Sequence, residues 1–209
     1  MLRRGVVTGL LASVAAAAWA EAPARVPRPL RRPEPGQDHA TGQMIAAAKL
    51  SPRDAADATT LTYGTARWQG FIDAVLRECV DRPLAELDGD VLDVLRVGTF
   101  EVTVGEEPAH IVNEWVEAAK RRVRRASGLV NATLRKVSRK TPDEWREHFT
   151  TTLSGDALIE ASTSHPSWIV RSFESVLPAS EVEALVNADN EPTHPTLIAL
   201  PGLANVPDG

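Results

Sequence analysis

Apolar residues at helical spacing, repeated in segment after segment, restrict the fold of this chain more than any other feature. Ile72, Val75, Leu76 and Cys79 lie at positions i, i+3, i+4 and i+7, the pattern of a helix with one buried face. The pattern recurs within residues 84–102, 112–119 and 130–137. Ala, Val and Leu dominate and aromatic residues make up only 5% of the 209 residues. The sequence therefore predicts an all-α protein, with Gly98 allowing two helices to approach closely.

Two proline-containing turns mark the predicted starts of helices. Ser51 and Pro52 form a cap-like start with proline in the first turn, and Thr141 and Pro142 repeat the arrangement. Further short helices are predicted within 164–176 and 180–190. Residues 196–202, TLIALPG, are apolar and β-capable, and they are predicted to form the first strand of a subdomain that the chain does not complete.

The first forty residues allow two interpretations. A basic start, an apolar stretch and Ala-Trp-Ala before Glu21 resemble a secretory signal. Alternatively, Val6, Leu10 and Val14 form one face of a first amphipathic helix over residues 2–17. The apolar run is too short and too rich in alanine for a membrane span. Residues 21–38 contain five prolines and are predicted to be a linker or a surface insertion.

No catalytic or metal-binding constellation is visible in the sequence. Cys79, the single cysteine, excludes an intramolecular disulfide framework and is predicted to be an ordinary core residue. Glycine-rich phosphate loops and nucleophile elbows are absent. The histidines are scattered without metal-ligand spacing; they are His39, His110, His148, His165 and His194.

A concentrated basic run is the feature that points most directly to a function. Residues 120–140 contain nine Lys or Arg and no Asp or Glu, whereas the other 188 residues contain 14 bases and 28 acids. Because no acid lies within the run, helical i, i+4 pairing inside it cannot explain the charge. The run is therefore either a solvated helix face or a footprint for the phosphates of a nucleic acid. The predicted contacts are Lys120, Arg121, Arg122, Arg124, Arg125, Asn131, Arg135, Lys136, Arg139 and Lys140.

The apolar interruption of this run is predicted to be a buried helical face. Val130, Leu134 and Val137 lie at helical spacing, which places Arg135 and its basic neighbours on the exposed side. Asn131 within this segment is unusual, because Asn is unfavourable inside a helix unless it caps or hydrogen-bonds a specific group. Its alternatives are a structural hydrogen bond and a contact with nucleic acid.

Five ordered segments carry a resemblance to a known family. They are residues 53–76, 81–102, 108–122, 128–139, and finally SHPSWIV together with NADNEPTHPTLIALPG. In this order they resemble the N-terminal part of bacterial 16S rRNA cytosine 5-methyltransferases of the Sun/Fmu type, which contains a helical domain similar to the antitermination factor NusB. Two positions depart from the family's usual pattern: Thr60 replaces Glu, and Leu129 replaces Phe with a similar apolar volume.

The resemblance implies a NusB-like RNA-binding bundle over residues 1–140, with 21–38 as an insertion, followed by a connector and the start of a methyltransferase subdomain over 141–209. It implies 16S rRNA as the partner and the cytoplasm as the location. S-adenosylmethionine is implied for the full-length family, and no cofactor is expected on this chain. Cys79 matches neither family catalytic cysteine. The alternatives are a free-standing NusB-type antitermination protein, which would end near the basic helix, and an exported helical protein.

Overall fold

The computed structural model describes residues 47–104 and 108–191. Within these ranges the chain forms nine α-helices and two short 3-10 helices, and no strand. The predicted all-α fold is therefore confirmed for this part of the chain. The predicted first helix at 2–17, the proline-rich residues 21–38 and the predicted strand at 196–202 lie outside the described residues.

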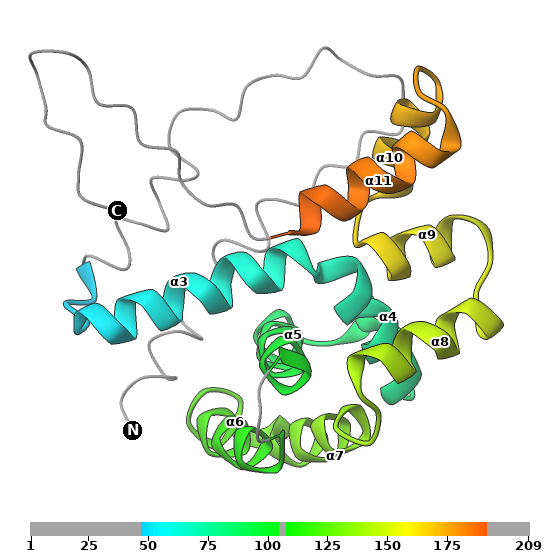
Figure 1. Ribbon diagram of the computed structural model, residues 1–209. Helices are drawn as coiled ribbons and strands as arrows, with labels where there is room; N and C mark the ends of the chain where they lie inside the picture. The colour runs from blue at the N-terminus through cyan, green and yellow to red at the C-terminus, as the bar shows by residue number, and fades with distance from the viewer. Residues whose placement is uncertain (1–46, 105–107, 192–209) are drawn as a thin grey trace, which may run out of the picture.

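The helices follow one another with short connections (Figure 1). They are α3 (Pro52–Arg67), α4 (Gln69–Cys79), η1 (Leu84–Glu86), α5 (Gly89–Val104), α6 (Pro108–Arg122), η2 (Arg124–Ala126), α7 (Ser127–Val137), α8 (Pro142–Thr152), α9 (Gly155–Thr163), α10 (Ser167–Glu174) and α11 (Ala179–Asn190).

Helix α5 lies at the centre of the bundle, with α3 and α4 on one side and α6 and α7 on the other (Figure 1). Its apolar residues are buried around most of its circumference, as expected for a helix that is covered by neighbours. Arg96 of α5 and Asp73 of α4 form a bidentate ion pair, with Nε–Oδ1 and Nη2–Oδ2 distances of 2.8 Å each. Both side chains are largely shielded from solvent, so this pair links the central helix to α4.

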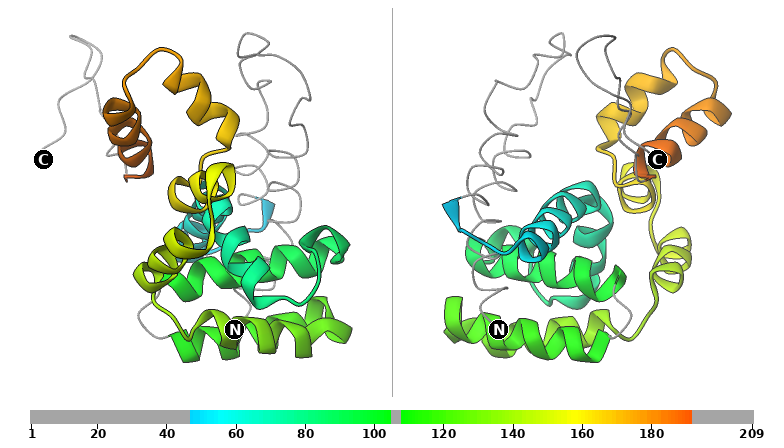
Figure 2. Two further views of the ribbon diagram at one scale, coloured as in Figure 1. Left: turned by 90° about the vertical axis from the view of Figure 1, so that its right-hand side faces the viewer. Right: turned by 60° about the vertical axis from the view of Figure 1, so that its left-hand side comes forward.

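Helices α6 and α7 lie side by side beneath α5 (Figure 2). The predicted close approach at Gly98 occurs at this layer: a Cβ atom on Gly98 would lie 2.9 Å from Leu134 Cδ1 of α7 and 3.4 Å from Trp115 Cγ of α6. A side chain at this position would have to displace the fully buried Leu134 side chain, so glycine allows α5 and α7 to pack closely. The prediction that Gly98 serves helix packing is confirmed.

Both predicted proline-containing helix starts are confirmed. The Ser51 hydroxyl accepts a hydrogen bond from the backbone N–H of Asp54 at 3.2 Å, with Pro52 in the first turn of α3. Thr141 and Glu144 form a reciprocal capping box at the start of α8. The hydrogen bonds from Thr141 hold the pKa of the Glu144 carboxyl below its usual value. These caps are local in sequence, which is why the pattern predicts them.

The apolar core of the bundle continues past residue 140. Trp145 and Phe149 of α8 are buried and stacked, with ring centroids 5.8 Å apart, and Ala161 of α9 belongs to the same core. A second, smaller cluster joins α10 and α11 around Val170 and Val182. The predicted division of the chain at residue 140 stays a prediction, but the hydrophobic contacts do not end there.

Candidate nucleic-acid interface

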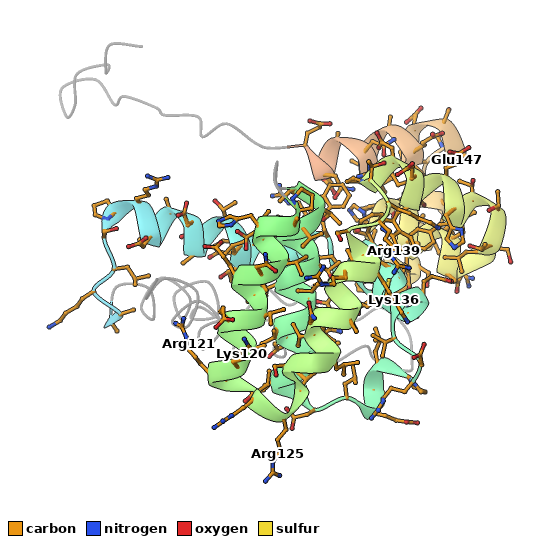
Figure 3. All side chains as sticks on the ribbon, turned by 90° about the horizontal axis from the view of Figure 1, so that it is seen from below. Lys120, Arg121, Arg125, Lys136, Arg139 and Glu147 are labelled. Atoms are coloured by element: carbon orange, nitrogen blue, oxygen red, sulfur yellow. The ribbon has the colours of Figure 1, made fainter. Side chains whose placement is uncertain are left out.

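The basic run occupies the end of α6, the 3-10 helix η2, α7 and the turn that follows α7. Its cations fall into two groups, which lie apart in Figure 3. The corner group, where α6 turns into α7, consists of Lys120, Arg121, Arg122, Arg124 and Arg125; the end group, at the C-terminal end of α7, consists of Arg135, Lys136, Arg139 and Lys140. Helix α7 has 11 residues and is about 16 Å long at 1.5 Å per residue. The corner group precedes its start, and the end group occupies its last turn and the residues that follow.

The apolar interruption of the run holds α7 onto the bundle. Val130, Leu134 and Val137 are all 0% exposed and belong to the main core. Leu129, the position that departs from the family pattern, is half-buried against the same core. The predicted buried face is therefore confirmed, and it fixes which side of α7 remains available to a ligand.

Two of the corner cations are paired with carboxylates that lie outside the run. Lys120 Nζ lies 2.6 Å from Glu117 Oε1, and this hydrogen bond holds the pKa of Glu117 below its usual value. Arg122 Nη2 lies 2.8 Å from Asp90 Oδ1 at the start of α5. Arg124 and Arg125, by contrast, are exposed and have no side-chain partner within the described part of the chain.

The end group is also divided between structural and available cations. Lys136 Nζ donates to the Cys79 carbonyl oxygen at 3.0 Å and lies 3.4 Å from Asp81 Oδ1, so it joins α7 to the C-terminal end of α4. Lys140 Nζ lies 4.5 Å from the centroid of the Trp145 ring. Arg139 is exposed and, among the described residues, has no side-chain partner.

These contacts correct two expectations from the sequence. Lys136 was predicted to decorate the exposed side of its helix, but it is half-buried and its ammonium group binds α4. The lack of acids within the run does rule out pairing inside it. However, Asp90, Asp81 and Glu117 supply carboxylates from outside the run. Asp90 in α5 and Asp81 in the loop after α4 are distant from it in sequence.

Asn131 has a side-chain partner inside α7. Its Oδ1 atom accepts a hydrogen bond from Arg135 Nε at 2.9 Å, one helical turn further along. Asn131 is thus neither an N-cap nor fully buried. The contact fixes the direction of the exposed Arg135 guanidinium without neutralising its charge. Arg135 is therefore a cation that is held in place and still available to an anion.

Part of the positive charge has a structural explanation in the helix dipoles. Arg121 and Arg122 lie in the last turn of α6, and Arg135 and Lys136 lie in the last turn of α7. Cations at helix C-termini interact favourably with the negative end of the helix dipole, by about 0.3–1 kcal/mol each. Arg124, Arg125 and Arg139 are the cations of the run that have no carboxylate partner, no aromatic contact and no place in the last turn of an α-helix, within the part of the chain that the structure describes.

The described residues show no arrangement suited to covalent chemistry. Cys79 is buried in the main core, and its burial raises the pKa of the thiol to about 11. A thiol with so high a pKa is a poor nucleophile at neutral pH. Within residues 47–104 and 108–191, no group of three or more His, Cys, Asp or Glu side chains is placed to hold a metal ion. Nor does any helix in these ranges have the length and apolar character of a membrane span.

Comparison with known proteins identifies the family. Residues 33–139 match the NusB family, and the chain belongs to that family. A solved crystal structure, that of PH0851, has the same fold, with a TM-score of 0.60 over 90% of this chain and 39% of that chain at 15% identity. The predicted resemblance to the NusB-like region is thereby confirmed.

The similarity to individual proteins extends beyond the NusB match. The Mycobacterium tuberculosis protein Rv1407 is 34% identical over 166 residues, which cover 77% of this chain and 36% of the relative. Ribosomal RNA small subunit methyltransferase B of Pseudomonas putida is 31% identical over 152 residues, covering 72% of this chain and 33% of the relative. The protein of the same name from Thermus thermophilus is 40% identical over 92 residues, covering 44% and 23%. The chain spans about a third of the length of the first two of these relatives.

Proposed function

We propose that this chain is the RNA-binding N-terminal part of an S-adenosylmethionine-dependent 16S rRNA (cytosine-5-)-methyltransferase, and that it acts in the cytoplasm, where that RNA is made. The extent of the similarity is the observation that carries this proposal. The match to Pseudomonas putida ribosomal RNA small subunit methyltransferase B covers 72% of this chain, whereas the NusB family match spans only residues 33–139. This difference favours the methyltransferase assignment over the alternative of a free-standing NusB-type antitermination protein.

Within this proposal, the chain contributes RNA binding and none of the chemistry of methyl transfer. S-adenosylmethionine would supply the methyl group, and a cysteine thiolate would attack the pyrimidine ring. The only cysteine of the sequence, Cys79, is buried with its pKa raised to about 11, so its environment does not fit that role. We expect the purified chain, incubated with labelled S-adenosylmethionine and unmethylated small-subunit RNA, to transfer no more label than a sample without protein.

Three arginines are the strongest candidates for phosphate contacts. Arg124, Arg125 and Arg139 are exposed and have no side-chain partner in the described ranges. They therefore lose no existing ion pair when they bind a phosphate. Arg122 and Lys136 would have to leave Asp90 and Asp81 first. We assign the principal contacts to the three arginines, with Arg135 as a fourth cation oriented by Asn131.

A charge-reversal experiment with a matched control tests this assignment. Arg124, Arg125 and Arg139 are replaced together by Glu, and the control replaces Arg53, Arg67 and Arg77, which are exposed arginines outside the run. Both variants change the net charge by the same amount. Affinity for a small-subunit rRNA transcript is then measured against salt concentration, and circular dichroism verifies that both variants fold.

We expect the variant in the run to bind RNA more weakly and with a flatter salt dependence. Each lost phosphate contact removes about 0.7 to 0.9 from the slope of log K against log salt concentration. The control should lose less affinity and keep most of the slope. Equal losses in the two variants would mean that only the overall charge matters, and unchanged binding in both would show that the basic run is a solvated face.

A further inference from the structure

The surface formed by the corner group, α7 and the end group combines positive charge with a lack of aromatic rings. Residues 120–140 contain no Phe, Tyr, Trp or His. Trp145, which Lys140 contacts, is only 5% exposed and stacks on Phe149. Proteins that bind single-stranded nucleic acids stack the unpaired bases on aromatic side chains. Within the described residues, this surface offers phosphate contacts and no aromatic ring for a base to stack on.

The exposed Tyr and Trp side chains of the described residues belong to other parts of the molecule. Tyr63 on α3 is 45% exposed, and Trp168 on α10 is 52% exposed. Both helices lie above α5 in Figure 1, whereas α6 and α7 lie below it. The bases of an RNA strand that follows α7 would therefore not reach these two rings.

The exposed face of α7 between the two groups of cations carries small side chains. Gly128 and Ala132 are exposed there, one helical turn apart, and Arg135 follows on the same face. A Cβ atom on Gly128 would meet nothing within 4 Å, so no neighbour among the described residues requires a glycine at this position. Asn131 orients the Arg135 guanidinium. A broad and shallow ligand can therefore approach α7 closely while the cations at both ends reach its phosphates.

The cations at the two ends are carried by a rigid support. Val130 and Leu134 fix α7 onto the main core, and Lys136 joins its C-terminal end to α4. Arg125 and Arg139 lie at opposite ends of this helix (Figure 3). A fixed array of cations loses least free energy when it binds an equally stiff array of phosphates, because a flexible strand must first be ordered. A nucleic-acid duplex is stiff over this length, whereas a single strand is not.

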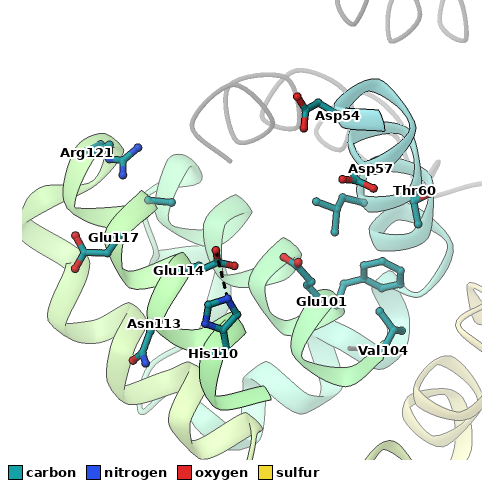
Figure 4. A pocket seen from close by; sticks show the side chains of 13 residues that line it. Asp54, Asp57, Thr60, Glu101, Val104, His110, Asn113, Glu114, Glu117 and Arg121 are labelled. Atoms are coloured by element: carbon teal, nitrogen blue, oxygen red, sulfur yellow. Dashed lines mark ion pairs between the residues drawn. The ribbon is translucent and has the colours of Figure 1, made fainter. Parts of the chain in front are cut away.

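An acidic pocket limits the direction in which RNA can extend from the corner group. The pocket lies between α3, α5 and α6 and has a volume of about 640 Å³ (Figure 4). Carboxylates from all three helices line it, among them Asp57, Glu101 and Glu114, and Arg121 lies at one edge. Carboxylates repel phosphates. RNA bound to the corner group therefore follows α7 toward the end group and does not cross α6 into the pocket.

We propose that this surface binds double-stranded, A-form RNA, with α7 lying across the wide and shallow minor groove. The corner group contacts the phosphates of one strand and the end group those of the other. This inference rests on the proposed RNA-binding function and names the form of RNA that the site takes. The bases stay paired and are not read, so binding depends on the shape of the duplex and little on its sequence. Unpaired nucleotides are left to other parts of the protein.

Binding of the full chain to four matched ligands tests the form of the nucleic acid. The ligands are an RNA duplex of about 16 base pairs, one of its strands alone, a DNA duplex of the same sequence, and an RNA duplex of unrelated sequence. Fluorescence anisotropy is measured at one salt concentration. We expect the RNA duplex to bind at least about tenfold more tightly than the single strand, and the two RNA duplexes to agree within about threefold. The DNA duplex, whose minor groove is only about 6 Å wide, should bind at least about threefold more weakly than the RNA duplex.

Each alternative outcome has a definite meaning. Tighter binding of the single strand would overturn the duplex assignment and leave the proposed RNA-binding function intact. Equal binding of the DNA and RNA duplexes would overturn recognition of the A-form shape, and a strong preference for one RNA sequence would overturn recognition through the backbone. If none of the four ligands binds although a small-subunit rRNA transcript does, the duplex assignment is wrong. If the transcript does not bind either, the proposed function itself fails.

Substitutions at both ends and in the middle of α7 test how the duplex lies. The double variant Arg124→Ala/Arg125→Ala and the single variant Arg139→Ala should each weaken duplex binding, with a loss of about 0.9 in the salt slope for each phosphate contact removed. Ala132→Leu keeps a good helix former at an exposed position, so Tm should change by about 2 °C or less. Its longer side chain holds the groove away from α7, and duplex affinity should fall by at least about threefold.

Arg77→Ala is the matched control, because Arg77 is an exposed arginine on α4 outside the run. It should leave duplex binding unchanged, and circular dichroism verifies that every variant folds. A loss of affinity at only one end of α7, or full affinity in the Ala132→Leu variant, would overturn the placement of α7 across the groove.

Discussion

Helices α3 to α9 and helices α10 to α11 differ sharply in how much apolar surface they bury. The first set shares one continuous core, in which Trp115, Leu95 and Leu134 are fully enclosed. The second set has its own cluster, whose buried members among the described residues are Val170, Val182 and Val186. Segments of fewer than about 40 residues rarely fold without additional support. The comparison indicates that α10 and α11 depend on α9, which they contact, for their position.

The joint between α9 and the bundle is formed by residues that are far apart in the sequence. The backbone N–H of Phe71, at the start of α4, donates to Ser164 Oγ at 3.1 Å, although 93 residues separate them. A Cβ atom on Gly70 would lie 2.4 Å from the Glu160 carbonyl oxygen. Asn190 Nδ2, at the end of α11, donates to the Thr163 carbonyl oxygen at 2.8 Å. The C-terminal end of α9 is therefore where both regions are held together.

Substituting one tryptophan in each region should give the largest difference. Trp115 is 0% exposed and its Nε1 atom lies 2.6 Å from Glu101 Oε2, so Trp115→Ala should cost about 3–5 kcal/mol of unfolding free energy. Trp168 of α10 is 52% exposed, and Trp168→Ala should cost about 0.5 kcal/mol or less. Denaturant unfolding measures both. Similar losses would contradict the idea that the two regions differ in burial.

The joint itself should respond to Ser164→Ala. Ser164 is buried, and its loss leaves the Phe71 N–H without an acceptor, at a cost of about 1–3 kcal/mol. Ser162→Ala is a suitable control, because that hydroxyl is exposed and bonds only within its own helix. We expect the control to change stability by about 0.5 kcal/mol or less. If the two variants were equally stable, Ser164 would not contribute to the joint.

Two matched valine substitutions sharpen the comparison further. Val130 is 0% exposed in the main core and Val186 is 2% exposed in the small cluster. Val130→Ala should lower the global unfolding free energy by about 1–2 kcal/mol. Val186→Ala should mainly increase local opening, which hydrogen exchange would detect as faster exchange of α11 amides with little change in the global transition. Uniform acceleration throughout the chain would show that the two regions unfold as one unit.

Thiol labelling provides the smallest perturbation. Burial raises the pKa of Cys79 to about 11, so the thiolate is scarce at pH 8 and iodoacetamide should label the native chain very slowly. In a Cys79→Ala background, Val186→Cys should be labelled faster because the small cluster opens more often. Rapid labelling of native Cys79 would contradict its burial.

The raised pKa of Cys79 also makes the stability of the fold depend on pH. The neutral thiol contributes its full stabilisation below about pH 9, and this contribution is lost as the pH rises through about 11.

Sequence patterns were sufficient where the determining contacts are local. The buried positions Val130, Leu134 and Val137 follow from helical spacing, and the caps at Ser51 and Thr141 follow from residues within three positions of each other. These features depend on a helix having 3.6 residues per turn and on its first N–H groups lacking internal partners. Apolar spacing and capping residues can both be recognised within the sequence of a single short segment.

The candidate site was only partly predictable for the same reason. The sequence located the basic run, because charge composition is a local property. It could not show that Arg122 is paired with Asp90 and Lys136 with Asp81, since these partners are 32 and 55 residues away. Nor could it show that Asp57, Glu101 and Glu114 line one pocket, because they come from three different helices, α3, α5 and α6.

By itself, then, the sequence determined most of the helices, their buried faces, two of their caps and the place of the positive charge, whereas α9 (Gly155–Thr163) was not among the predicted helices. The tertiary structure alone decided which cations remain without a carboxylate and which residue caps the start of α4. Ser164 and Phe71 meet across 93 residues, and their contact exists only because α4 and α9 pack together. The spacing of apolar residues along a helix specifies which of its faces is apolar, but it does not specify which other helix covers that face.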